Sequence, residues 1–279
     1  MPGSTRLRAP LAFALLGVAC KDPPPPAPPP PAPVRKVVPD AGLPSLERPA
    51  PKGGEVRTLP GGALELVGHT EAIIAVALDP TGAKAATGGL DRSVRLWDLT
   101  EGKLLWSAGP ADEAITALAF DPSGAVLAAG DRAFQVRLFA AKDGAMLTRR
   151  AHPDSVNALS FSPDGGWIAV AGMAGNAEVY PVASEAGSAC ELRRRTVDFT
   201  DDGKYLVTAL QAGGLLTTTF PKCKKQKETS TGPHQPLSSA SGRATLVATH
   251  DGAEPTVLLW DAVGGRMLGK LDGQTGNVT

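Results

Sequence analysis

Residues His69–Asp98 read HTEAIIAVALDPTGAKAATGGLDRSVRLWD, and this stretch predicts three short β-strands separated by tight turns. The apolar, β-branched run Ile73–Leu78 predicts the first strand, and Asp79–Gly82 supplies a turn with proline and glycine at favoured positions. Lys84–Gly88 is a strand of small residues, and Ser93–Trp97 alternates apolar and polar residues. Such a meander cannot bury both of its faces alone, so we expect further copies to pack against it.

Further copies follow at a spacing of about 40 residues. The turn glycine recurs at Gly82, Gly124, Gly165, Gly203 and Gly242. A bulky residue closes the third strand of each copy, at Trp97, Phe139, Tyr180, Phe220 and Trp260. This period, with Gly-His opening and Trp-Asp closing the first copy, resembles the WD40 family of β-propellers. The resemblance covers roughly four-fifths of the chain and implies an all-β fold with four strands per blade.

The resemblance implies a WD40-type propeller over residues 58–279, with about five recognisable repeats. We expect these repeats at residues 69–109, 110–150, 151–187, 188–228 and 229–271. A sixth copy begins near Gly273, so we expect an incomplete propeller that is a fragment of a six- or seven-bladed one; the alternatives are imperfect closure or pairing with a second chain. The strand Gly62–Val67 precedes Gly68-His69, and the family pattern implies that it completes the last blade.

Residues 1–20 are typical of an export signal, with Arg6 and Arg8 before the apolar run Leu11–Ala19. The run leads to Cys20 and resembles a bacterial lipoprotein signal, which implies acylation of that cysteine; ordinary cleavage is the alternative. In that class an aspartate directly after the cysteine retains the protein in the inner membrane, and here Lys21 stands between Cys20 and Asp22. We therefore expect attachment to the outer membrane, on its periplasmic side. Residues 21–57 predict a disordered, proline-rich linker, in which the run at 23–33 forms a polyproline spacer of about 35 Å.

Composition and motifs argue against several classes of function. The 28 basic and 28 acidic residues give no net charge, so no basic field predicts nucleic-acid binding. Membrane contact is expected only through the lipid anchor. The sequence lacks a Gly-x-Ser-x-Gly elbow, a His-Glu-x-x-His motif and a phosphate-binding loop. We therefore expect no enzyme activity, no cofactor and no metal site.

The best-formed group of residues that could make a polar site consists of His69, Thr87, Asp91 and Trp97. The WD40 resemblance implies that these residue types make a buried hydrogen-bond network within one repeat. A hydroxyl, a histidine and an aspartate are also the parts of a hydrolase triad. The resemblance implies that the histidine points inward and holds loops against strands, so we interpret the group as structural. In the second copy we assign Asp131 to the aspartate position, and later copies lose more of the pattern.

Two cysteines remain once Cys20 is set aside. Cys190 and Cys223 both lie in or beside the fourth copy, and an exported protein can form a disulfide there. The family register places Cys190 near the loop that opens this copy and Cys223 after its third strand, which can lie at opposite ends of a blade. Pairing requires Cα atoms within about 7 Å, so the sequence leaves the disulfide open.

The function predicted from the sequence is a non-catalytic protein-binding scaffold at the bacterial cell envelope, with a partner protein of unknown identity. Binding residues usually lie on loops, and the candidates on the histidine side are Leu90, Arg92, Arg132 and Phe134. The alternative for these side chains is that they fold back onto their own blade. The rival function is an enzyme or small-ligand binder in the central channel, for which the first strands offer Thr116 and Asn157.

Overall fold

A computed structural model describes the protein at residues 54–184, 186–210, 214–231, 235–239, 246–250 and 257–271. The expected signal sequence with Cys20, the linker up to residue 53 and the sixth copy near Gly273 lie outside these ranges. All regular elements within the ranges are β-strands, which confirms the all-β prediction. No helix in this described part is long and apolar enough to cross a membrane.

The strands form five antiparallel sheets, and each sheet contains one four-stranded meander that we call a blade. Blade 1 comprises β3 (Ile73–Leu78), β4 (Lys84–Gly89), β5 (Val94–Asp98) and β6 (Lys103–Ala108). Blade 2 comprises β7 (Ile115–Phe120), β8 (Val126–Asp131), β9 (Gln135–Ala140) and β10 (Met146–Ala151). Blade 3 comprises β11 (Val156–Phe161), β12 (Trp167–Gly172), β13 (Ala177–Pro181) and β14 (Cys190–Leu192).

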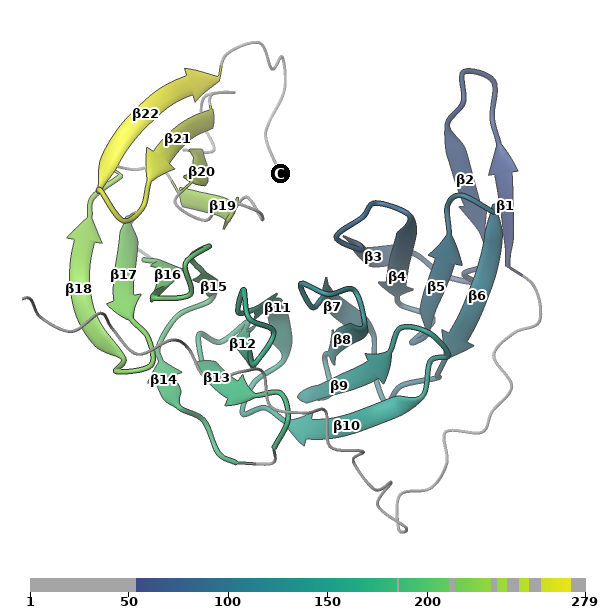
Figure 1. The fold of residues 1–279 in the computed structure, drawn as a ribbon, viewed down its shortest axis with the longest axis horizontal. Coiled ribbons are helices and arrows are strands. Elements are labelled where there is room, and N and C mark those ends of the chain that lie inside the picture. The colour runs from purple at the N-terminus through teal and green to yellow at the C-terminus, as the bar shows by residue number, and fades with distance from the viewer. Residues whose placement is uncertain are drawn as a thin grey trace, which may run out of the picture. The chain divides into compact units, whose positions relative to one another are not determined.

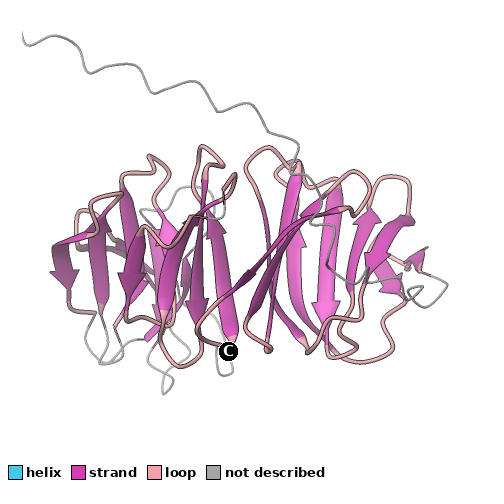
Figure 2. Cartoon of the chain, turned by 90° about the horizontal axis from the view of Figure 1, so that it is seen from below, coloured by secondary structure: helices cyan, strands magenta, loops and turns pink. Residues whose placement is uncertain are grey.

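The last two sheets repeat the pattern. Blade 4 comprises β15 (Asp198–Phe199), β16 (Tyr205–Ala209), β17 (Leu215–Thr219) and β18 (Lys224–Thr229). Blade 5 comprises β19 (Gln235–Ser239), β20 (Leu246–His250), β21 (Val257–Asp261) and β22 (Arg266–Leu271). The sheets follow one another in chain order, with the first strands β3, β7, β11 and β15 toward a common centre (Figure 1). Loops gather at the two ends of the strands (Figure 2).

Blade 1 carries two additional strands, which correct the prediction for Gly62–Val67. The strand β2 (Leu64–Val67) pairs with β1 (Glu55–Thr58), and β1 continues the sheet at β6, so this hairpin extends the outer edge of blade 1 instead of completing the last blade (Figure 1). Regular structure therefore begins at Glu55, inside the range predicted to be linker. The hairpin forms because β6 exposes an unpaired edge that a strand of the same chain can reach.

The third blade also departs from its predicted bounds. Its fourth strand is β14, which pairs with β13 through Val179 and Cys190 and lies beyond the predicted end of this copy at residue 187. The loop between β13 and β14 is longer than in the first two blades, where the fourth strand begins five or six residues after the third. Cys190 therefore belongs to the outer strand of blade 3 and not to the loop that opens blade 4.

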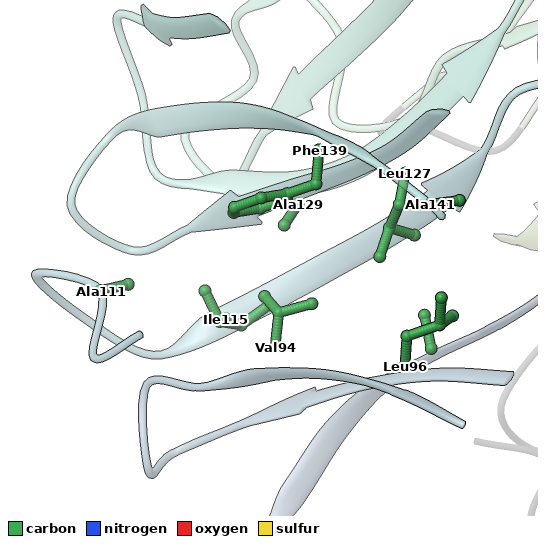
Figure 3. Packing of buried hydrophobic residues seen from close by; sticks show 9 residues of the cluster. Val94, Leu96, Ala111, Ile115, Leu127, Ala129, Phe139 and Ala141 are labelled. Atoms are coloured by element: carbon green, nitrogen blue, oxygen red, sulfur yellow. The ribbon is translucent and has the colours of Figure 1, made fainter. Parts of the chain in front are cut away.

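The core lies between neighbouring blades. Val94 and Leu96 of blade 1 face Ile115 and Leu127 of blade 2, and all four side chains are buried (Figure 3). Small residues allow this approach: a Cβ atom on Gly130 would overlap the Val156 side chain of the next blade. The alanine and glycine in the second strands thus place each blade close enough for the first strand of the next to pack on it.

Candidate functional site

Blade 1 brings the four residues of the predicted network together. His69 precedes β3, Thr87 lies on β4 and Asp91 in the following turn. The His69 Nδ1 atom lies 2.9 Å from an Asp91 carboxylate oxygen, and its Nε2 atom lies 2.7 Å from the Thr87 hydroxyl. The Trp97 indole N–H donates to the same hydroxyl at 2.8 Å. A neutral histidine satisfies every contact, since Nδ1–H donates to the carboxylate and Nε2 accepts from the threonine.

The network is buried, and this favours a structural role over a catalytic triad. We call such a set of side-chain contacts, which holds two loops of one blade together, a clamp. Thr87 is 2% exposed and Trp97 is 0% exposed, so protein atoms surround the hydroxyl. Burial tends to raise the pKa of Asp91, but hydrogen bonds from His69 and Ser93 outweigh it and hold the pKa below its ordinary value. Asp91 also accepts from the backbone N–H of Thr70 and Ser93. The network therefore fixes the turn after β4 against the loop before β3.

Blade 2 builds its clamp from different residues, which corrects the assignment of Asp131. The strand register aligns Asp131 with Gly89, because they oppose Ile115 and Ile73, and it therefore aligns Ala133 with Asp91. Asp131 is instead paired with the buried guanidinium of Arg137 on β9. Arg137 also donates to Asp112 in the loop before β7, at 3.0 Å. An aspartate–arginine pair thus links the same two loops that His69 links in blade 1.

Blade 4 also differs from its sequence assignment. Trp97 opposes Ala85, and Leu206 is the equivalent of Ala85 in blade 4. Leu206 opposes Thr218, so Thr218 and not Phe220 occupies the position of Trp97. The Phe220 ring packs edge-on against Trp167 and Phe199, each at 5.2 Å between ring centroids. The aromatic side chain therefore joins blade 4 to blade 3 instead of supporting a network within its own blade.

Cys190 and Cys223 form a disulfide, which resolves the pairing that the sequence left open. Their Cα atoms lie 5.7 Å apart, within the range that a disulfide can bridge. Cys190 is on the outer strand of blade 3, and Cys223 is in the turn between β17 and β18 of blade 4. The two cysteines do not lie at opposite ends of one blade, as the family register suggested, because they belong to the outer edges of adjacent blades. The disulfide therefore joins these blades covalently.

The predicted binding residues lie in equivalent turns between the second and third strands of successive blades. Register places Leu90 of blade 1, Arg132 of blade 2 and Met173 of blade 3 at one equivalent position. Leu90 is 38% and Met173 is 53% exposed, and Arg132 is also exposed. Met173 was missed in the sequence, although it follows Gly172 as Leu90 follows Gly89. These turns form a row that we call the turn row: Leu90, Arg92, Arg132, Phe134 and Met173.

Two members of the turn row adopt a backbone conformation that favours glycine. Arg92 has a φ of 62° and Phe134 a φ of 66°, whereas the equivalent residue of blade 3 is Gly175. A bulky residue in this region is strained, at a cost of about 1 to 3 kcal/mol. Phe134 is nevertheless 50% exposed, so its ring does not offset that strain by folding back onto its blade. Arg92 and Phe134 thus present exposed side chains at positions where glycine would be less strained.

The first strands surround a central cavity of about 1440 Å³. Its polar lining is engaged between blades: Thr116 donates to the Val156 carbonyl, and Asn157 donates to the Arg195 carbonyl. Ser160 of β11 donates its hydroxyl to Asp198 of β15, a pair that the sequence analysis overlooked. Burial raises the pKa of Asp198 to about 6, although the Ser160 hydrogen bond acts in the opposite direction. Thr116, Asn157 and Ser160 therefore tie neighbouring blades together.

Asp198 makes folding stability depend on pH. Its pKa is about 6 in the folded protein and about 4 in an unfolded chain, so the folded state binds the proton more tightly. The stabilisation is complete below about pH 4 and is lost as the pH rises through 6, a change of about 2 to 3 kcal/mol. Asp198→Asn retains an oxygen acceptor for Ser160 and is expected to flatten this part of the profile and to raise stability at pH 8.

Urea unfolding between pH 4 and pH 8 measures this effect, with Asp143→Asn on an exposed turn as the matched control. Equal profiles for the wild type and the Asp198→Asn variant would show that Asp198 does not carry the dependence. Among the residues that the structure describes, no group of three or more His, Cys, Asp or Glu side chains could hold a metal ion.

Comparison with known proteins identifies the repeats. The family described as WD domain, G-beta repeat matches residues 62–98, 102–139 and 145–180. Each matched segment begins with an outer strand and ends with the third strand of the following blade. By this alignment β2 corresponds to β6 and β10, the outer strands of blades 1 and 2, although β2 pairs with β1 here.

Similar curated proteins share only short segments with this chain. Ribosome biogenesis protein erb1 of Botryotinia fuckeliana (strain B05.10) is 44% identical over 64 residues, which are 23% of this chain and 8% of that protein. Small ribosomal subunit protein RACK1y of Oryza sativa subsp. japonica is 50% identical over 42 residues, which are 15% of this chain and 12% of that protein. The chain thus spans about a tenth of these relatives, so the likeness concerns one to two repeats. The chain carries WD40 repeats, arranged as blades of an all-β, propeller-type fold.

Proposed function

We propose that this protein is a non-catalytic scaffold that binds a partner protein through the turn row. The observation that carries the proposal is the exposure of Phe134 in a strained conformation, on a turn aligned with those that present Leu90 and Met173. Aromatic residues, methionine and arginine are enriched at protein interfaces, and the row combines all three types. Two similar proteins are named for ribosome biogenesis and for the small ribosomal subunit, so such repeats occur in proteins of large assemblies.

The rigid clamps in blades 1 and 2 support this role. The His69 network and the Asp131–Arg137 pair each hold a turn of the row against the loop beside it. A surface that is fixed before binding loses less conformational entropy when the partner docks. The buried hydroxyl of Thr87 serves the clamp, and we assign it no catalytic role.

We further propose that the scaffold is exported and attached to the bacterial cell envelope through a lipid on Cys20. The charged and apolar residues before Cys20 and the proline run after it support this location, on the periplasmic side of the outer membrane. The disulfide is compatible with it, since disulfides persist in oxidising compartments. The partner would then be an envelope protein within reach of a spacer of about 35 Å.

Affinity purification from cross-linked cells tests both parts of the proposal. The Arg132→Ala/Phe134→Ala variant is expected to lose about 2 kcal/mol or more of binding free energy, and so to deplete the partner roughly thirtyfold. Lys142→Ala, at the exposed turn between β9 and β10, is the matched control and should retain the partner. Equal recovery by all three chains would refute the turn row. Membrane retention of a Cys20→Ser variant would refute the lipid anchor.

A small-ligand site in the central cavity is the second candidate, favoured by the cavity volume and by the carboxyl group of Asp198. It is weaker because Thr116, Asn157 and Ser160 already hydrogen-bond to the neighbouring blade. A ligand that raises the melting temperature of the wild type but not of Asp198→Asn would favour this candidate over the scaffold.

A further inference from the structure

The same interface recurs between neighbouring blades from blade 1 to blade 4. Residues from the first strand of one blade pack on the preceding blade: Leu118 and Phe120 of β7 on blade 1, Leu159 and Phe161 of β11 on blade 2. Val197 and Phe199 of blade 4 pack in the same way on blade 3 and are 4% and 3% exposed. The interface is therefore a property of the repeat and not of one blade.

Blade 1 presents the same face without a cover. Val76 and Leu78 of β3 are equivalent to Leu118 and Phe120 by strand register. They are 64% and 60% exposed, and Ile73, equivalent to the Ile115 that packs on Gly88 of blade 1, is 40% exposed. Ile73, Val76 and Leu78 lie on one side of β3, across the bulge between Ile73 and Ala75, and form an apolar patch of the kind that is typical of an interaction surface. We call this patch the β3 face.

Blade 5 presents the opposite half of the interface. Leu105 of blade 1 and Leu147 of blade 2 lie in outer strands and are partly buried against the following blade. Register makes Leu268 of β22 equivalent to them, since Met267 opposes Trp260 as Leu104 opposes Trp97. Leu268 is 48% exposed. The described residues thus include exposed members of both sides of the interface that the internal blades use: the β3 face on one side and Leu268 on the other.

We propose that the β3 face binds blade 5 of a second copy of this chain. The contact continues the blade-to-blade interface across two molecules, with the β3 face of one copy on the side of blade 5 that carries Leu268 in the other. The contact is heterologous, because two different surfaces meet. Two molecules form a closed ring when each places its β3 face on blade 5 of the other. The occupant has the required chemistry, since Leu268 lies at the position from which Leu105 and Leu147 pack on the blade that follows them.

Sedimentation velocity of the full chain over a concentration series tests the proposal. The chain carries Cys20→Ser, so that a lipid cannot hold molecules together. We expect concentration-dependent self-association, weakened at least about tenfold by Val76→Asp or by Leu268→Asp, because either change places a carboxylate in an apolar contact. Leu59→Asp is the matched control: Leu59 is 42% exposed in the turn between β1 and β2, and its replacement should leave association unchanged.

Mixing the two variants separates this contact from other forms of association. The Val76→Asp chain keeps an intact blade 5, and the Leu268→Asp chain keeps an intact β3 face, so the mixture should associate more strongly than either variant alone. A wild-type chain that stays monomeric at all concentrations would overturn the proposal. Equal weakening by Leu59→Asp, or a mixture that does not associate, would also overturn it. Circular dichroism checks the fold, and Val76→Ser replaces Val76→Asp if the latter unfolds.

Discussion

Replacing Asp131 with alanine is expected to lower the free energy of unfolding by about 3 to 5 kcal/mol, because it leaves the guanidinium of Arg137 buried without its closest partner. Arg137 is 2% exposed and Asp131 is 0% exposed, so water does not replace the lost carboxylate. The remaining contact from Arg137 to Asp112, at 3.0 Å, places the expected loss toward the lower end of this range. Urea unfolding of both proteins at pH 7 measures the difference.

Two controls isolate the buried charge. Asp112 also pairs with Arg137, but its side chain is 55% exposed, so Asp112→Ala is expected to cost about 1 kcal/mol or less. The double variant Asp131→Ala/Arg137→Met removes both charges and is expected to be more stable than Asp131→Ala alone. An equal loss for Asp112→Ala and Asp131→Ala would contradict the view that Asp131 compensates a buried charge.

Removal of the disulfide is expected to cost about 3 to 4 kcal/mol in the chain-entropy treatment of loop closure. The bond closes a separation of 33 residues and joins blade 3 to blade 4. The clamps of blades 1 and 2 act within one blade, whereas this bond constrains two blades relative to each other. The Cys190→Ala/Cys223→Ala variant should therefore unfold at lower urea concentration than the wild type.

A reducing agent provides the control for this comparison. It should lower the stability of the wild type to that of the double variant and leave the double variant unchanged. Stability that is unaffected by both the substitutions and the reductant would show that the noncovalent contacts between the two blades, among them Phe220 on Trp167 and Ser160 to Asp198, suffice to join them.

Features that lie within one repeat could be predicted from the sequence. The strands Ile73–Leu78 and Val94–Asp98 follow from local patterns, and His69, Thr87 and Trp97 lie at spacings that the repeat itself fixes. The all-β fold was predicted for the same reason, because each meander carries its own turns and its own apolar strands. Among the candidate binding residues, the exposure of Phe134 depends on which way one ring turns, and this does not follow from spacing.

Features that depend on two blades could not be predicted in this way. The hairpin of β1 and β2 occupies the edge of β6 because that edge is free in the folded protein, which a strand pattern does not reveal. The disulfide depends on an extended loop that moves Cys190 to the outer edge of blade 3. Asp198 acquires its raised pKa only because the first strands of blades 3 and 4 bury it together.

Cross-linking from the turn row tests the scaffold proposal most directly. A photoreactive amino acid replaces Phe134 in one chain and Lys142 in another, since both side chains are exposed but lie on different turns of blade 2. After irradiation of living cells, position 134 is expected to form a covalent adduct with one partner protein, and position 142 is not. Equal labelling from both positions, or no protein adduct from position 134, would contradict the proposal that the turn row is the binding surface.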